Sequence, residues 1–176
     1  MSKSTTKKLS ENERAKARVA IAKDVIKRIQ SGKIRSMGNG YGYIEFDTDL
    51  KHKVCKMEDD YEKCITPQDV KKIAKNCYVC AMGALILSKV GLFNQLTWRD
   101  LFNFDTREDY ENALFDYFDE DELYEIEDAF ECNMSKAGKF GYLFKNDNDR
   151  LLAIMQNIVD HNGTFKPEVE YEIVLA

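Results

Sequence analysis

The chain has 176 residues, of which 44% are hydrophobic and 11% aromatic, with only two prolines and nine glycines. This length suits one domain, and the composition excludes a low-complexity chain. No apolar run approaches the roughly 20 residues of a membrane span, and the polar N-terminus lacks the apolar stretch of a signal peptide. We therefore expect a cytoplasmic protein without membrane association, with a flexible basic arm over residues 1–9 and a single globular domain over residues 10–176.

The net charge of −5 is unevenly distributed along the chain. Residues 1–35 hold eleven Lys and Arg against three acids, whereas residues 105–131 hold thirteen acids and one basic residue, Arg107. The two segments could be solvated helix faces, could face each other within the chain or across a homo-oligomer, or could meet a charged partner. The net acidity argues against direct binding to nucleic acid.

The first predicted helix covers residues 11–31. Ser10 and Glu13 have the spacing of a capping box, and Gly32 fits the position that ends a helix. The apolar residues between them recur at helical spacing and form a broad stripe of Val19, Ala22, Val25, Ile26 and Ile29.

Two segments have the character of strands. Residues 41–46 are aromatic and β-branched, and they follow a glycine-containing turn. Residues 169–175 alternate between apolar and acidic side chains with a period of two. We expect these segments to pair as a small two-stranded element.

The most apolar stretch predicts a central helix over residues 76–90, because its side chains are apolar nearly all round. Three further amphipathic helices are predicted over residues 107–118, 121–131 and 148–161, and residues 133–145 between the last two are expected to form a loop. The predicted fold class is α+β, predominantly α-helical, with five or so amphipathic helices around the central helix. Inward-facing residues of the three helices are Tyr110, Ala113, Leu114, Tyr117, Phe118, Leu123, Ile126, Phe130, Leu151, Leu152, Met155, Ile158 and Val159.

The five cysteines include Cys77 and Cys80, in a Cys-x-x-Cys pattern. A zinc site needs a second pair of ligands at a suitable spacing, which the chain lacks. A redox pair needs its first sulfur at a helix N-terminus, which requires a helix start at Asn76. A cysteine nucleophile with His161 as base has no residue to orient it. We expect the two cysteines to be small core residues, and we predict no metal site, no cofactor and no catalytic residue.

A glycine inside the central helix, Gly83, points to close packing. Glycine costs a helix about 0.5–1 kcal/mol relative to alanine, so the missing side chain must serve a purpose. Close approach of another helix is the first explanation, and contact with a ligand is the second.

The segment from Cys80 to Leu85 resembles small uncharacterised bacterial and phage proteins that carry a Cys-x-x-Gly-Ala-Leu helix. In those proteins an Asn-Asp pair opens a later helix, and Asn146-Asp147 followed by Arg150 looks similar here; a short aromatic strand is also shared. The resemblance covers about half of the chain and implies a phage or mobile-element origin, but no mechanism. The ligand-binding candidates that it suggests are Cys80, Gly83, Asn146, Asp147, Arg150 and Tyr41.

These observations favour a non-enzymatic binding protein, encoded by a phage, that sequesters a small nucleotide-like signalling molecule or inhibits a host protein. One alternative is an acidic protein that imitates nucleic acid and occupies a DNA-binding protein. A second alternative is a cysteine hydrolase that uses Cys77 or Cys80. The residues expected to contact a protein partner are Asp116, Asp119, Glu120, Asp121 and Glu122.

Overall fold

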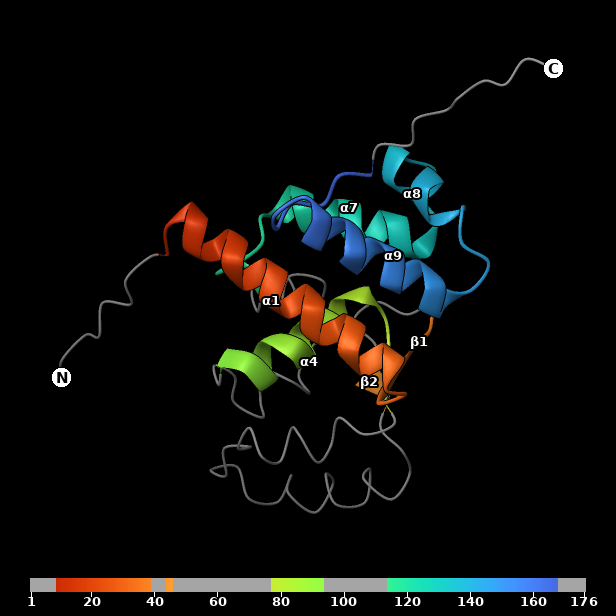
Figure 1. The fold of residues 1–176 in the computed structure, drawn as a ribbon. Coiled ribbons are helices and arrows are strands. Elements are labelled where there is room, and N and C mark those ends of the chain that lie inside the picture. The colour runs from red at the N-terminus through yellow and green to blue at the C-terminus, as the bar shows by residue number, and fades with distance from the viewer. Residues whose placement is uncertain (1–8, 39–43, 46–76, 94–113, 168–176) are drawn as a thin grey trace, which may run out of the picture.

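A computed structural model describes residues 9–38, 44–45, 77–93 and 114–167 of the chain. These residues form an α+β fold that is predominantly helical, which confirms the predicted fold class. Figure 1 shows α1 (Glu11–Gln30) crossing the molecule, with α9 (Asp147–Asp160) on one side of it and α4 (Ala81–Phe93) on the other. The helix α7 (Glu120–Glu131) packs against α9 and α4, and the short helix α8 (Lys136–Gly141) packs on α7. No helix in the described part of the chain is long and apolar enough to cross a membrane.

The predicted boundaries of α1 are confirmed. The Ser10 hydroxyl accepts a hydrogen bond from the Glu13 amide, and the Glu13 carboxylate accepts one from the Ser10 amide at 2.8 Å. Gly32, at φ 67°, follows the end of the helix. The buried face is centred on Ile21, Ala22 and Val25, whereas the predicted core residues Val19 and Ile26 are only half-buried.

The described residues contribute three strands to the sheet, in the order β1-β3-β2. The central strand β3 (Cys77–Val79) runs parallel to β1 (Ile34–Ser36) and antiparallel to β2 (Ile44–Glu45). The prediction that the central helix begins at residue 76 was therefore wrong, because residues 77–79 are a strand. Residues 44–45 of the strand predicted at 41–46 form β2, which pairs with β3. The other residues of that segment lie outside the described part, as do residues 169–175, with which it was expected to pair.

The helix α4 forms the middle of the core, as predicted for the apolar stretch. Every residue from Ala81 to Val90 is buried, so the helix has no solvent-facing side until its last turn. Cys80 caps the N-terminus of this helix, because its sulfur accepts a hydrogen bond from the Gly83 amide at 3.4 Å. The helix therefore begins directly after β3, without a loop between the two elements.

Two of the three remaining predicted helices are present as α7 and α9, within one residue of the expected bounds. Residues 115–118 form a turn and a bend instead of the end of a third helix, although Tyr117 and Phe118 are buried as predicted. Residues 107–113 of that predicted helix lie outside the described part. The structure also adds α8 within the expected loop, and Ser135 caps it by accepting from the Gly138 amide at 3.0 Å.

Candidate functional site

The first candidate region lies at the carboxyl ends of the parallel strands β1 and β3. The Met37 amide donates to the Val79 carbonyl at 2.9 Å, just before α4 begins. On the other side, the Gly38 amide donates to the Asp147 carboxylate at 2.8 Å, and Ser36 donates to the side chain of Asn148 through its amide and its hydroxyl. The segment 36–38 is therefore flanked by the first turns of α4 and α9.

Five of the six predicted ligand-binding residues lie in or next to these two helix starts: Cys80, Gly83, Asn146, Asp147 and Arg150. The sixth, Tyr41, lies outside the described residues. The polar side chains are engaged within the protein. Asn146 caps α9 by accepting from the Asp149 amide at 2.9 Å, and Asp147 accepts from both Gly38 and Arg150.

Arg150 joins the helix ends on this side of the molecule. Its guanidinium donates to the Phe130 carbonyl near the end of α7 at 2.8 Å and to the Gly141 carbonyl at the end of α8 at 3.2 Å. A cation at the carbonyl ends of two helices satisfies groups that no intrahelical bond can reach and opposes their negative dipole ends. These contacts give Arg150 a structural role, because they join α9 to the ends of α7 and α8.

The cysteines of the Cys-x-x-Cys pattern are both buried. Desolvation raises the pKa of the Cys77 thiol to about 12, although Arg28 lowers it by a smaller amount. Because the thiolate is the nucleophile, Cys77 is protonated and unreactive at neutral pH. His161 lies at the far end of α9, about 20 Å along the helix from the strand ends, and is exposed. This arrangement gives the cysteine-hydrolase hypothesis no support.

Side chains of the kinds that bind metals do not gather into a site in the described part of the chain. Among the residues that the structure describes, no group of three or more His, Cys, Asp and Glu side chains is placed to hold a metal ion.

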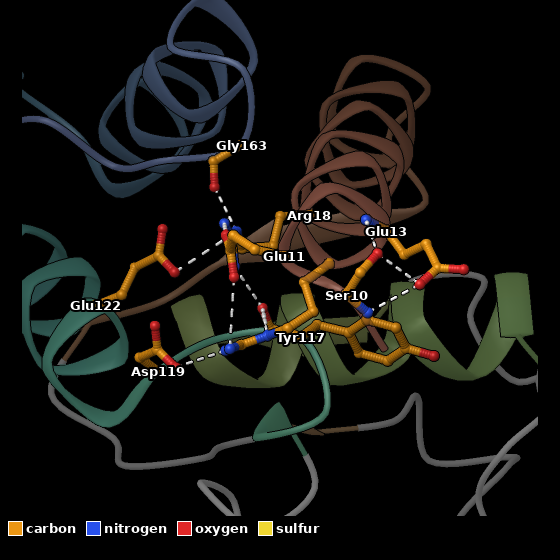
Figure 2. A network of polar contacts seen from close by, with 9 residues as sticks. Ser10, Glu11, Glu13, Arg18, Tyr117, Asp119, Glu122 and Gly163 are labelled. Carbon is orange, nitrogen blue, oxygen red and sulfur yellow. Dashed lines mark hydrogen bonds and ion pairs between the residues drawn. The ribbon is translucent and has the colours of Figure 1, made fainter. Parts of the chain in front are cut away.

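The second candidate region joins the basic helix α1 to the acidic segment before and within α7 (Figure 2). Arg18 is only 3% exposed, and its guanidinium donates to the Gly163 carbonyl at 2.5 Å and to the Tyr117 carbonyl at 2.7 Å. It also pairs with Glu11 and lies 3.6 Å from a Glu122 oxygen. Arg14, one turn earlier, pairs with Asp119 at 2.6 Å. The oppositely charged segments therefore meet within one chain.

This network divides the five acids that were expected to contact a partner. Asp119 and Glu122 are turned toward α1, and the Glu122 side chain is only 12% exposed. Asp116, Glu120 and Asp121 are exposed and form no ion pair with α1, and we refer to these three residues as the acidic surface. Asp119 is also 69% exposed, but it is paired with Arg14. Asp116 lies 3.8 Å from the ammonium group of Lys89, whereas Glu120 and Asp121 form no ion pair with a described residue. The sequence analysis did not predict that Arg14 and Arg18 would bind this acidic segment.

The carboxyl group of Glu122 has an unusual environment. Burial raises its pKa above the ordinary value of a glutamate, although the charge of Arg18 and a hydrogen bond from the Phe165 amide both lower it. The folded protein therefore binds this proton more tightly than the unfolded chain does. The resulting stabilisation is present below the usual glutamate pKa of about 4.3 and is lost as the pH rises through the higher pKa of the folded state.

Glu122→Gln is expected to remove this dependence, because glutamine resembles the protonated acid and cannot ionise. The free energy of unfolding of the variant, relative to the unmodified protein, should rise as the pH increases from the acidic range to neutrality. Denaturant unfolding at a series of pH values measures this difference. Glu120→Gln, an exposed residue on the same helix turn, makes the same change of charge as a control. A difference that falls with pH would contradict the assignment.

Comparison with family models, with curated proteins and with solved structures finds no match for this chain. The function is therefore inferred from the residues of this chain.

Proposed function

We propose that this protein is a non-enzymatic binding protein whose acidic surface docks on a positively charged surface of another protein. A phage-encoded inhibitor of a host protein would act in this way. The observation that supports the proposal most directly is the division of the acids at the start of α7. Asp119 and Glu122 pair with arginines of α1, whereas Asp116, Glu120 and Asp121 are exposed to solvent and form no ion pair with α1.

The attachment matters because it fixes the exposed carboxylates before any partner arrives. Tyr117, between Asp116 and Asp119, is buried, and its carbonyl accepts hydrogen bonds from Arg18 and Arg14. A charged surface held in one conformation loses less conformational entropy on binding, and its field steers an oppositely charged partner during the encounter. Proteins that bind nucleic acid carry positive surfaces of this kind, so they form one class of suitable partner.

Sequestration of a small molecule and cysteine-dependent hydrolysis receive less support from the geometry. The polar side chains where the strands end are engaged in contacts within α9 and with Gly38 and the end of α7, so they offer a small molecule few unsatisfied groups. The raised pKa of Cys77 opposes thiol chemistry. Docking through the acidic surface makes use of side chains that the fold leaves exposed.

The proposal is tested with a short oligolysine peptide as the probe. Carbodiimide cross-linking joins a carboxylate to a lysine in contact with it, and peptide mass spectrometry then locates the joined acids. We expect the cross-links to concentrate on Asp116, Glu120 and Asp121 and to decline as salt is added, because salt screens exposed charges. Cross-links spread evenly over the acids of the chain would contradict the proposal.

A matched pair of variants separates the position of a charge from its amount. Asp121→Lys should weaken binding of the peptide by roughly fivefold, since it replaces an attraction by a repulsion. Asp149→Lys changes the net charge equally but lies in the first turn of α9, beside the opposite end of α7, and it should leave the affinity nearly unchanged. Fluorescence anisotropy measures both affinities. Equal weakening by the two variants would show that net charge alone governs binding.

A further inference from the structure

The helix α8 and its flanks carry an exposed surface of a different composition from the rest of the molecule. Met134 is fully exposed, Tyr142 is 68% exposed and Leu143 is 58% exposed, which makes them the most exposed large hydrophobic side chains of the described residues. Lys136 and Lys139 are exposed beside them, and residues 132–146 contain no acid. We refer to these five residues as the lysine–apolar corner. Clustered apolar side chains on a surface commonly mark an interaction site.

The corner is fixed to the body of the protein. A Cβ atom added at Gly141 would lie 1.8 Å from the Ala129 carbonyl oxygen of α7, so the two helices are in direct backbone contact. On its inner side, Phe140 packs edge-on against Phe165 with ring centroids 5.7 Å apart. The exposed apolar side chains of Met134, Tyr142 and Leu143 therefore lie in the turns directly before and after a helix that is packed closely on α7.

Acidic side chains continue from the corner along α7. Asp121, Glu125 and Ala129 are spaced four residues apart and so form one row on the helix surface. Ala129 lies beneath α8, whereas Asp121 and Glu125 are exposed. One end of this surface, at α8, is positive and apolar, and the other end, at the start of α7, is negative. The helix α7, which runs between them, is about 18 Å long.

The corner has no ionic partner within the described part of the chain. Lys136 and Lys139 form no ion pair with a described residue, and neither do Asp121 and Glu125. An anionic lipid surface would attract the lysines but repel the acids of the neighbouring row. A second copy of the chain offers charges of both signs.

We propose that this protein forms a two-fold symmetric homodimer in which the lysine–apolar corner of each copy packs on the Asp121–Glu125 row of the other. A two-fold interface uses the same surface on both subunits, so a surface with a positive and a negative end is complementary to itself. The apolar side chains of the corner are then removed from water next to the paired charges. Because Asp121 belongs to both surfaces, the dimer covers part of the acidic surface and competes with a partner for it.

Sedimentation of the full chain at low salt tests the dimer. We expect dimers that dissociate as salt is added, and we expect Lys136→Glu/Lys139→Glu and Asp121→Lys/Glu125→Lys each to raise the dissociation constant by about tenfold or more. Lys16→Glu/Lys23→Glu, on the exposed side of α1, is the control for a loss of positive charge and should remain dimeric.

Mixing the two interface variants provides the decisive measurement. In a two-fold dimer, the mixed pair brings the introduced glutamates of one copy against the introduced lysines of the other. It also brings the native Lys136 and Lys139 against native acids, so dimers should reappear. A mixture that stays monomeric would overturn the proposal, as would a monomeric unmodified protein or a monomer that binds phosphatidylserine vesicles through the corner. Oligolysine cross-links at Asp116 and Glu120 would still form in those cases, so the docking function is tested separately.

Discussion

Replacement of Arg18 by methionine is expected to lower the free energy of unfolding by about 3–5 kcal/mol, as is typical when one partner of a buried ionic network is removed. Methionine fills much of the same volume but removes the hydrogen bond that the Gly163 carbonyl accepts from Arg18, and it leaves the Tyr117 carbonyl with Arg14 as its donor. It also leaves the largely buried carboxylate of Glu122 without its cation. Denaturant unfolding measures the loss.

Two further variants identify the cause of that loss. Arg14→Met removes a neighbouring arginine whose main partner, Asp119, is 69% exposed, so the expected loss is only about 1 kcal/mol. Adding Glu122→Gln to Arg18→Met removes the unpaired charge and should recover part of the stability, which a double-mutant cycle detects. Similar losses for Arg14→Met and Arg18→Met would show that burial of Arg18 is not decisive.

Gly141→Ala is expected to destabilise the protein by about 3 kcal/mol, the upper end of the range for overpacking. The added methyl group would lie 1.8 Å from a backbone oxygen of α7, and this atom cannot move without displacing the helix. Because α8 must then shift, the variant should also weaken the proposed dimer. Thermal unfolding and sedimentation measure the two effects.

Gly32→Ala provides the comparison for Gly141→Ala. Gly32 has a positive φ of 67° but nothing within 4 Å of the added methyl group, so only backbone strain opposes the change. The expected loss is about 1 kcal/mol. If Gly141→Ala costs no more than Gly32→Ala, the contact between α7 and α8 is looser than the structure indicates.

The sequence predicted the helices whose ends and faces carry local signals. Ser10 and Glu13 form a capping box, and Gly32 follows the helix that they open, so α1 could be bounded from both ends. The helices α7 and α9 each have one apolar side and one polar side, and their periodicity identified the buried residues. In each of these helices one face is exposed to solvent, and the sequence shows it as polar residues at helical spacing.

The apolar stretch at residues 76–90 has no such alternation of polar and apolar residues. Helix α4 is buried on nearly all sides, and the exposed position of strand β3 is occupied by the aromatic Tyr78, so neither element shows a polar–apolar period that distinguishes strand from helix. The boundary between them is Cys80, which caps α4 through its sulfur and is not among the residues that usually cap helices. Local propensity therefore could not separate the two elements.

The candidate surfaces were predicted only in part. The exposed acids at the start of α7 were identified, but the pairing of Asp119 and Glu122 with arginines of α1 depends on where α1 packs. Arg18 looks like a solvated cation on an amphipathic helix, because its acceptors are backbone carbonyls of distant residues. The helix α8 contains Gly138 and Gly141, which favour a loop until packing on α7 selects the helix.

The pairing of α1 with the end of α9 has a consequence for synthesis of the protein. Arg18 and its acceptor Gly163 are separated by 145 residues, so α1 leaves the ribosome long before its main packing partner exists. At typical elongation rates the interval is on the order of ten to thirty seconds. Of the described elements that pack on α1, only β1 and α4 are synthesised before α9. The nascent chain therefore completes this part of its core only after translation has passed α9, and a chain truncated before α9 would present α1 to chaperones and proteases.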